Sequence, residues 1–195
     1  MKKLLLVFIS LFISLSLAFN QPDTTAAIKN TEQLCSIADT IQKGNPNGDL
    51  FLIRQMNFET FELLPWQTLE SAPEAEMWMM QLVIYKHDSN IILAVLAETS
   101  PSGDWETETK YYFWPDGSIA KTEALLSTFL GNAVIHREYI YDKTGKLLKQ
   151  EETIRDMNTG VVIERETASF MDKPPELFLT LDELKTKLEL PDSVK

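Results

Sequence analysis

Cysteine and histidine are scarce in this sequence, and their scarcity excludes several kinds of chemistry. The 195 residues include one cysteine, Cys35, and two histidines, His87 and His136. A single cysteine cannot form an internal disulfide, and a catalytic zinc site needs three protein ligands. His136 and Glu138 are two residues apart and would share a strand face, but no third ligand stands out near them. We therefore expect no metal site and no cofactor.

Glycine-rich functional motifs are also missing. The chain contains seven glycines, and none of them belongs to a phosphate-binding loop, a dinucleotide fingerprint or a Gly-x-Ser-x-Gly elbow. No Cys–His pair has a context that would activate a nucleophile. The sequence therefore offers no catalytic residue, and a non-enzymatic protein is the expectation.

Basic residues are outnumbered by acidic ones. The chain has 18 Lys and Arg against 29 Asp and Glu, a net charge of −11 at pH 7. The basic residues are scattered among acids, and such a surface repels nucleic-acid phosphates and anionic lipid. We expect no nucleic-acid partner, whereas a basic protein would be attracted.

One long apolar run lies at the N-terminus. Met1-Lys2-Lys3 precedes a run from Leu4 to Leu17, and Ser16-Leu17-Ala18 has small residues at both ends. This order is typical of a cleaved secretory signal. The run is shorter than the roughly 20 residues of a spanning helix, although an uncleaved anchor is the alternative. We expect residues 1–18 to be removed, leaving residues 19–195 as one exported domain, periplasmic or extracellular, without a stable membrane span.

Residues 26–43 have the spacing of a helix, followed by Gly44 as a stop signal. The apolar residues that recur at three- and four-residue intervals are Leu34, Ile37, Ala38 and Ile41. Cys35 lies beside this stripe, so we expect its thiol to be buried. An intermolecular disulfide is the alternative for an unpaired cysteine in an exported protein.

Residues 76–170 form the strand-rich part of the chain. Residues 105–114 alternate between apolar and polar side chains, which is typical of a half-buried antiparallel strand. Residues 112–121 resemble residues 140–149, each with an aromatic strand, a turn that ends in glycine and an apolar pair. The expected strands are 49–56, 78–86, 91–97, 105–114, 118–128, 133–142, 146–155 and 161–170, with an irregular segment at 57–75.

A short helix is expected near the C-terminus. Pro174-Pro175 interrupts the strand pattern, and Thr180 with Glu183 forms a capping box before an apolar face of Leu181, Leu184 and Leu188. The whole chain is therefore predicted to be an α+β domain. Its N-terminal helix packs on a curled antiparallel meander of about six to eight strands, and a short C-terminal helix follows.

Aromatic side chains are the best remaining lead to a binding site. They could stack on a sugar or hold an apolar ligand, or they could fill the core. The candidate ligand-binding residues are Trp105, Tyr111, Phe113, Tyr139 and Tyr141. We expect an exported non-enzymatic protein that binds an unidentified ligand or envelope protein through an aromatic-lined face of the sheet.

Two alternatives stay open. The acidic surface would suit an inhibitor or immunity-type protein that acts on a basic target. A carboxylate-dependent envelope hydrolase would need two acids in a cleft with their pKa values pushed apart. Carboxylates are too numerous in this chain to select such a pair from the sequence.

Overall fold

The computed structural model describes residues 24–70, 78–165 and 170–194. The predicted signal, residues 1–18, lies outside the described residues, so its removal stays a prediction. Among the residues that are described, no helix is long and apolar enough to cross a membrane.

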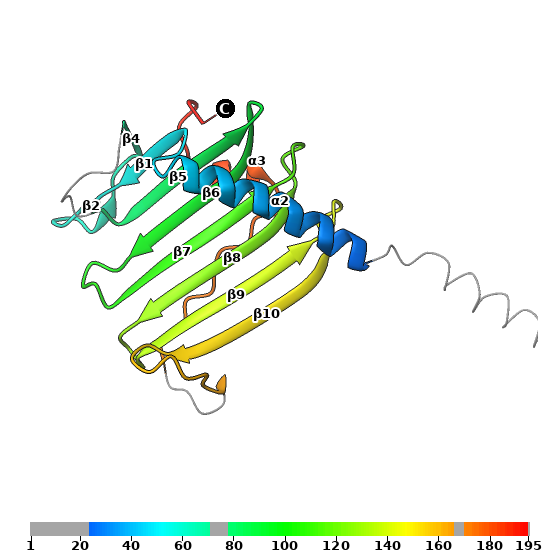
Figure 1. Cartoon of the computed structure of the whole chain (residues 1–195). Coiled ribbons are helices and arrows are strands. Elements are labelled where there is room, and N and C mark those ends of the chain that lie inside the picture. The colour runs from blue at the N-terminus through cyan, green and yellow to red at the C-terminus, as the bar shows by residue number, and fades with distance from the viewer. Residues whose placement is uncertain (1–23, 71–77, 166–169, 195) are drawn as a thin grey trace, which may run out of the picture.

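An eight-stranded antiparallel sheet dominates the structure (Figure 1). Its strand order is β10-β9-β8-β7-β6-β5-β1-β4, so the strands from β5 to β10 each pair with the next along the chain. The sheet is not closed into a barrel. The strands are β1 (Leu50–Arg54), β4 (Gln67–Leu69), β5 (Met80–His87), β6 (Asn90–Thr99), β7 (Trp105–Phe113), β8 (Ile119–Thr128), β9 (Ala133–Tyr141) and β10 (Leu147–Asp156). Two further short strands, β2 (Met56–Asn57) and β3 (Glu62–Leu63), form a separate hairpin. The predicted meander is confirmed.

Alternation along each strand gives the sheet two distinct faces. In β7, Tyr111 lies opposite Ala94 of β6 and Thr122 of β8, and these side chains share one face. Its neighbour Tyr112 lies opposite Leu93 and Lys121 on the other face. We call the Tyr112 side the helix face and the Tyr111 side the tail face.

Helix α2 (Thr24–Gly44) packs on the helix face through Thr31, Cys35 and Ala38, which are buried. The predicted helix and the predicted burial of Cys35 are both confirmed. The buried sheet residues of this cluster are Phe51, Ile53, Val83, Tyr85, Ile92, Leu93, Val95, Tyr112 and Ala120. Figure 1 shows α2 crossing near one end of the strands, and no other segment described lies over the rest of this face.

The C-terminal segment, residues 170–194, covers the tail face (Figure 1). It contains helix α3 (Leu181–Lys187), which buries Leu184 against the sheet. The predicted cap is confirmed, because Thr180 Oγ1 accepts a hydrogen bond from the Glu183 amide at 3.1 Å. The Glu183 carboxylate in turn accepts from the Leu179 amide at 2.7 Å. The first bond satisfies an amide that the first turn of a helix leaves unpaired, and the second ties the residue before the cap, Leu179, to the same turn.

The strand predicted at 161–170 is wrong for the residues described there. After β10 the chain turns at Asp156, and only an isolated bridge joins Arg155 to Val162. The side chains of Val161 and Val162 are exposed. Valine-rich sequence favours a strand, but Val161 and Val162 bury little apolar surface against the sheet, and propensity alone does not extend the pairing beyond Ile163, whose amide donates to the Ile154 carbonyl at 2.9 Å.

Two hairpin turns that look alike in sequence also share their backbone bonds, because the Gly117 amide donates to the Trp114 carbonyl at 2.8 Å and the Gly145 amide to the Asp142 carbonyl at 3.0 Å. Their aspartates stand at different places in the turn, one residue before Gly117 and three residues before Gly145. In one, Asp116 accepts hydrogen bonds from the amide and hydroxyl of Ser118. In the other, Asp142 accepts from the amide and hydroxyl of Thr144. The glycines that follow these aspartates, Gly117 and Gly145, have φ values of 82° and 81°, which favour glycine.

Candidate functional site

The five aromatic candidates lie on the tail face, beneath the chain's own C-terminal segment. Four of them are buried: Tyr111, Phe113, Tyr139 and Tyr141. The Tyr111 hydroxyl donates to the Glu176 carbonyl at 2.9 Å, and its ring lies 5.2 Å from that of Phe178. The amino group of Lys173 lies 4.0 Å from the ring centre of Trp105. These side chains therefore contribute to the core, and a ligand role for them stays a prediction.

A network of charges joins α2 to the middle of the helix face. Lys121 Nζ lies 2.7 Å from Glu138 and 3.0 Å from Glu123, and His136 Nε2 lies 3.0 Å from Glu123. The Tyr112 hydroxyl donates to Asp39 of α2 at 2.9 Å. His136 and Glu138 share this face as the sequence indicates, but the partner of His136 is on β8. The spacing of residues along β9 could not have shown that the partner of His136 is Glu123, which lies on the neighbouring strand.

Both glutamates of this network are held in the ionised form. Burial raises the pKa of Glu123, but hydrogen bonds from His136 and Lys121 outweigh it and leave the pKa below its usual value. At Glu138 burial is likewise outweighed by Lys121 and Lys149, and the pKa is lowered. A general acid needs a carboxyl with a raised pKa. This pair therefore does not supply the acid that a hydrolase requires, and its contacts connect neighbouring strands.

A polar hollow of about 280 Å³ lies beside α2, where Cys35, Asp39, Lys121 and Glu138 line it. Burial raises the pKa of the Cys35 thiol to about 12. The thiolate is the nucleophilic form of cysteine. The thiol is therefore protonated at neutral pH, and this hollow has no activated nucleophile.

An open groove runs across the uncovered part of the helix face. One hollow of about 310 Å³ is lined by Trp78, Gln81, Ala97, Glu106, Glu108, Leu125 and Ser127, among others. A second hollow of about 340 Å³ is lined by Thr99, Gly103, Trp105, Glu106, Ser127, Phe129 and Met157. Both hollows include Glu106 and Ser127, so they adjoin near the end of the sheet, where Trp105 of the tail face also lines the second one. We call the two hollows together the open-face groove.

The open-face groove combines exposed apolar side chains with two uncompensated acids. Leu125 is 40% exposed and Phe129 is 69% exposed. The cross-strand neighbours of Glu106 are Thr99 and Ser127, and those of Glu108 are Ala97 and Leu125. Within the part of the chain that is described, neither carboxylate has an ion-pair partner. Lys121 and Glu138 on the same face, by contrast, form an ion pair at 2.7 Å.

The sequence shows part of this groove. The alternation in residues 105–114 places Glu106 and Glu108 together on the polar face of β7, as the structure confirms. It does not show that Leu125 and Phe129 lie beside them, because that depends on the pairing register of β8. It also gives no sign that α2 leaves this part of the sheet uncovered.

Comparisons of the chain with protein-family models, curated proteins and solved structures find no match. No family supplies a function by analogy. The function must therefore be argued from the geometry of these surfaces.

Proposed function

We propose that this protein is an exported, non-enzymatic binding protein whose open-face groove takes a basic protein partner. The observation that carries the proposal is the pair of unpaired carboxylates, Glu106 and Glu108, in the same groove as the exposed side chains of Leu125 and Phe129. An inhibitor or immunity-type protein that acts on a basic target is one form of this function.

Charge supports a basic partner in two ways. Glu106 and Glu108 are two residues apart on one strand face, so their like charges repel, and their cross-strand neighbours are uncharged. Lys110, the next residue on that face, donates to Gln42 at 3.2 Å and forms no ion pair with either glutamate. A lysine or arginine of a partner would relieve this repulsion. The net charge of −11 would also speed the encounter with a basic protein.

Apolar contacts would supply the rest of the affinity. Protein interfaces have apolar centres with a polar rim, and a few central side chains contribute most of the binding energy. Leu125 lies in the groove directly across from Glu108. Phe129 lines the adjoining hollow. A partner side chain that packs between them would place its basic neighbours near the glutamates.

The test compares capture by the purified protein and by groove variants. The bait is exposed to the exported fraction of cells that make the protein. Leu125→Arg places a cation and excess volume in the groove, and the double change Glu106→Gln with Glu108→Gln removes the charges. We expect a basic protein that wild type captures and that both variants lose, with capture falling as salt increases.

A matched control removes two charges elsewhere. Glu59→Gln with Glu62→Gln changes two exposed glutamates of the β2–β3 hairpin, which do not line the groove. This variant should capture the partner as well as wild type does. The proposal would be contradicted if wild type captured no protein, or if the groove variants captured the same proteins as wild type.

A further inference from the structure

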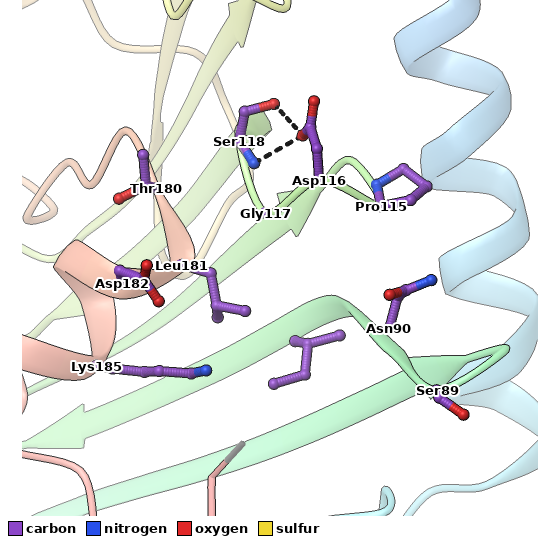
Figure 2. A pocket seen from close by; sticks show the side chains of 11 residues that line it. Ser89, Asn90, Pro115, Asp116, Gly117, Ser118, Thr180, Leu181, Asp182 and Lys185 are labelled. Carbon is purple, nitrogen blue, oxygen red and sulfur yellow. Dashed lines mark hydrogen bonds between the residues drawn. The ribbon is translucent and has the colours of Figure 1, made fainter.

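The C-terminal segment, residues 170–194, is bonded to the sheet at two places that lie far apart along it. Just before α3, the Leu181 amide donates to the Gly117 carbonyl at 2.8 Å. Figure 2 shows this part of the segment beside the β7–β8 turn. Near the start of the segment, the Met171 amide donates to the Leu130 carbonyl at 3.0 Å. The first place adjoins the β7–β8 turn, and the second adjoins the open-face groove.

Side chains hold the stretch between these two places. Among the described residues, residues 172–178 form no backbone-to-backbone hydrogen bond with the sheet. Asp172 pairs with Arg137 of β9, which is 5% exposed, and with Arg165 at 3.2 Å. Arg137 also donates to the Lys173 carbonyl at 3.4 Å. A buried charge that loses its partner is costly, so Arg137 fixes Asp172 in place.

The residue after Asp172 contacts both hollows of the open-face groove. Lys173 Nζ lies 4.0 Å from the ring centre of Trp105 and 3.1 Å from the Glu98 carboxylate. Trp105 lines one hollow and Glu98 lines the other. An ammonium group over an indole ring is attracted to it. Lys173 therefore holds the indole from the side of the tail face.

The residue before Asp172 is bonded to the turn that carries Phe129. The bond from the Met171 amide to the Leu130 carbonyl fixes the residue that follows Phe129. Phe129 lines the same hollow as Trp105. Three consecutive residues of the C-terminal segment thus support two aromatic side chains of that hollow.

We infer, on the basis of the proposed function, that residues 171–173 position one wall of the open-face groove. Asp172 anchors this short stretch to Arg137, and Lys173 holds the indole of Trp105. Asp172 and Lys173 are positioning residues, because they act on the partner through Trp105 and Phe129. The affinity of the groove therefore depends on contacts made on the opposite face of the sheet.

The first test follows Trp105 by ¹⁹F NMR of the protein labelled with 5-fluorotryptophan, in which Trp105→Phe assigns the resonance. Lys173→Met keeps the aliphatic stem and removes the cation, so the Trp105 resonance should shift. Lys173→Arg keeps a cation and should leave the resonance close to that of wild type. The matched control is Lys143→Met, because Lys143 Nζ lies 5.1 Å from the ring centre of Trp114. This control should shift the Trp114 resonance and leave that of Trp105 unchanged.

A second pair of variants tests the anchor. Asp172→Asn should also shift the Trp105 resonance, although Lys173 is the residue that lies over the ring. Glu152→Gln removes the same charge from the other carboxylate that pairs with Arg137. Glu152 belongs to β10 and not to the C-terminal segment, so this variant should leave the resonance in place. Urea denaturation of both variants checks that each is folded under the conditions of the spectra.

The binding test uses the peptide acetyl-Lys-Leu-Lys-amide, in which an apolar side chain has basic neighbours. Wild type should bind it with a millimolar Kd, measured from the backbone amide signals of β7 and β8. Lys173→Met and Asp172→Asn should each weaken binding about threefold. Loss of the Lys173 charge by itself would favour a cationic peptide, so weaker binding separates positioning from simple electrostatics. Glu152→Gln and Lys143→Met should bind nearly as well as wild type.

Three results would overturn the inference. The Trp105 resonance could respond to Lys173→Met no more than to Lys143→Met, Asp172→Asn and Glu152→Gln could act alike, or the resonance could shift without any change in affinity. Failure of wild type to bind the peptide would count against the proposed function instead. The ¹⁹F spectra would then still decide whether residues 171–173 fix the position of Trp105.

Discussion

At the scale of single residues, Cys35 shows how position decides chemistry. It is 7% exposed, it lies between α2 and the sheet, and its raised pKa keeps the thiol protonated. Lys121 opposes this shift but does not cancel the effect of burial. A cysteine that could have been a nucleophile or an intermolecular link is therefore a small buried side chain.

Thiol labelling tests this reading of Cys35. The native protein should react slowly with a thiol reagent at pH 8, and the protein unfolded in urea should react fast, since unfolding restores a pKa near 8.5. Non-reducing gels should show a monomer. Rapid labelling of the folded protein, or a dimer band that reductant removes, would contradict burial.

At the scale of elements, the two helices hold opposite faces of one sheet by different means. Helix α2 buries Cys35 and Ala38, with Leu34 and Ile41 half-buried beside them, and adds polar contacts to Tyr112 and Lys110, while Ile37 of the predicted apolar stripe is exposed. Helix α3 is anchored by Leu184 and Leu188, which are buried in the cluster of the tail face. Seven residues are too few for a helix that is stable alone, so packing must hold α3 in place.

A pair of substitutions on α3 measures that packing. Leu184 is fully buried, so Leu184→Ala should lower the free energy of unfolding by about 3 kcal/mol. Thr186→Ala, at an exposed position of the same helix, should change it by less than about 0.5 kcal/mol. Urea denaturation gives both values. Equal effects would mean that α3 does not contribute to the core.

Local sequence signals predicted where the helices and strands lie better than they predicted how these elements pack on one another. The hairpins are correct because aspartate and glycine mark their turns, and the caps of α3 are correct because Thr180 and Glu183 stand at fixed spacing. The path of the C-terminal segment across the tail face was not predictable, since among the described residues it forms one isolated β-bridge, Ser118–Thr180, and is otherwise held by side-chain contacts and single backbone bonds such as that from the Met171 amide to the Leu130 carbonyl. The groove was missed for a related reason: its side chains come from several strands and depend on register.

At the scale of the whole molecule, charge pairing makes stability depend on pH. Glu123, Glu138 and Glu152 all have lowered pKa values in the folded protein. A carboxyl with a lowered folded pKa contributes stability that is present above its unfolded pKa. This contribution is lost as the pH falls through the folded pKa, which here lies below the usual value of about 4.3.

Urea denaturation across pH tests this account. The free energy of unfolding of wild type should be steady near neutral pH and should fall below about pH 4.5. The double variant Glu123→Gln with Glu138→Gln should be less stable at pH 7, because Lys121 loses both partners. The free energy of unfolding of this variant should also change less than that of wild type as the pH falls below about 4.5. If the free energy of unfolding of the variant fell as steeply in acid as that of wild type, the ion pairs of Glu123 and Glu138 would not be the cause of the acid destabilisation.

The central claim concerns which surface of the molecule meets a partner. The tail face is filled by the chain's own C-terminal segment, and α2 covers only one end of the helix face. The open-face groove remains, with exposed apolar side chains beside uncompensated acids. Partner contact should therefore map to β7, β8 and the β8–β9 turn.

Site-directed photocrosslinking measures this contact most directly. A photoreactive residue replaces Leu125 or Phe129 in the groove, or Phe61 as a control that is exposed and apolar but lies on the β2–β3 hairpin. Each protein is irradiated with the exported fraction of the cells that make it. The account predicts an adduct with one basic protein from positions 125 and 129 and none from position 61. An adduct from position 61 alone, or none from either groove position, would contradict it.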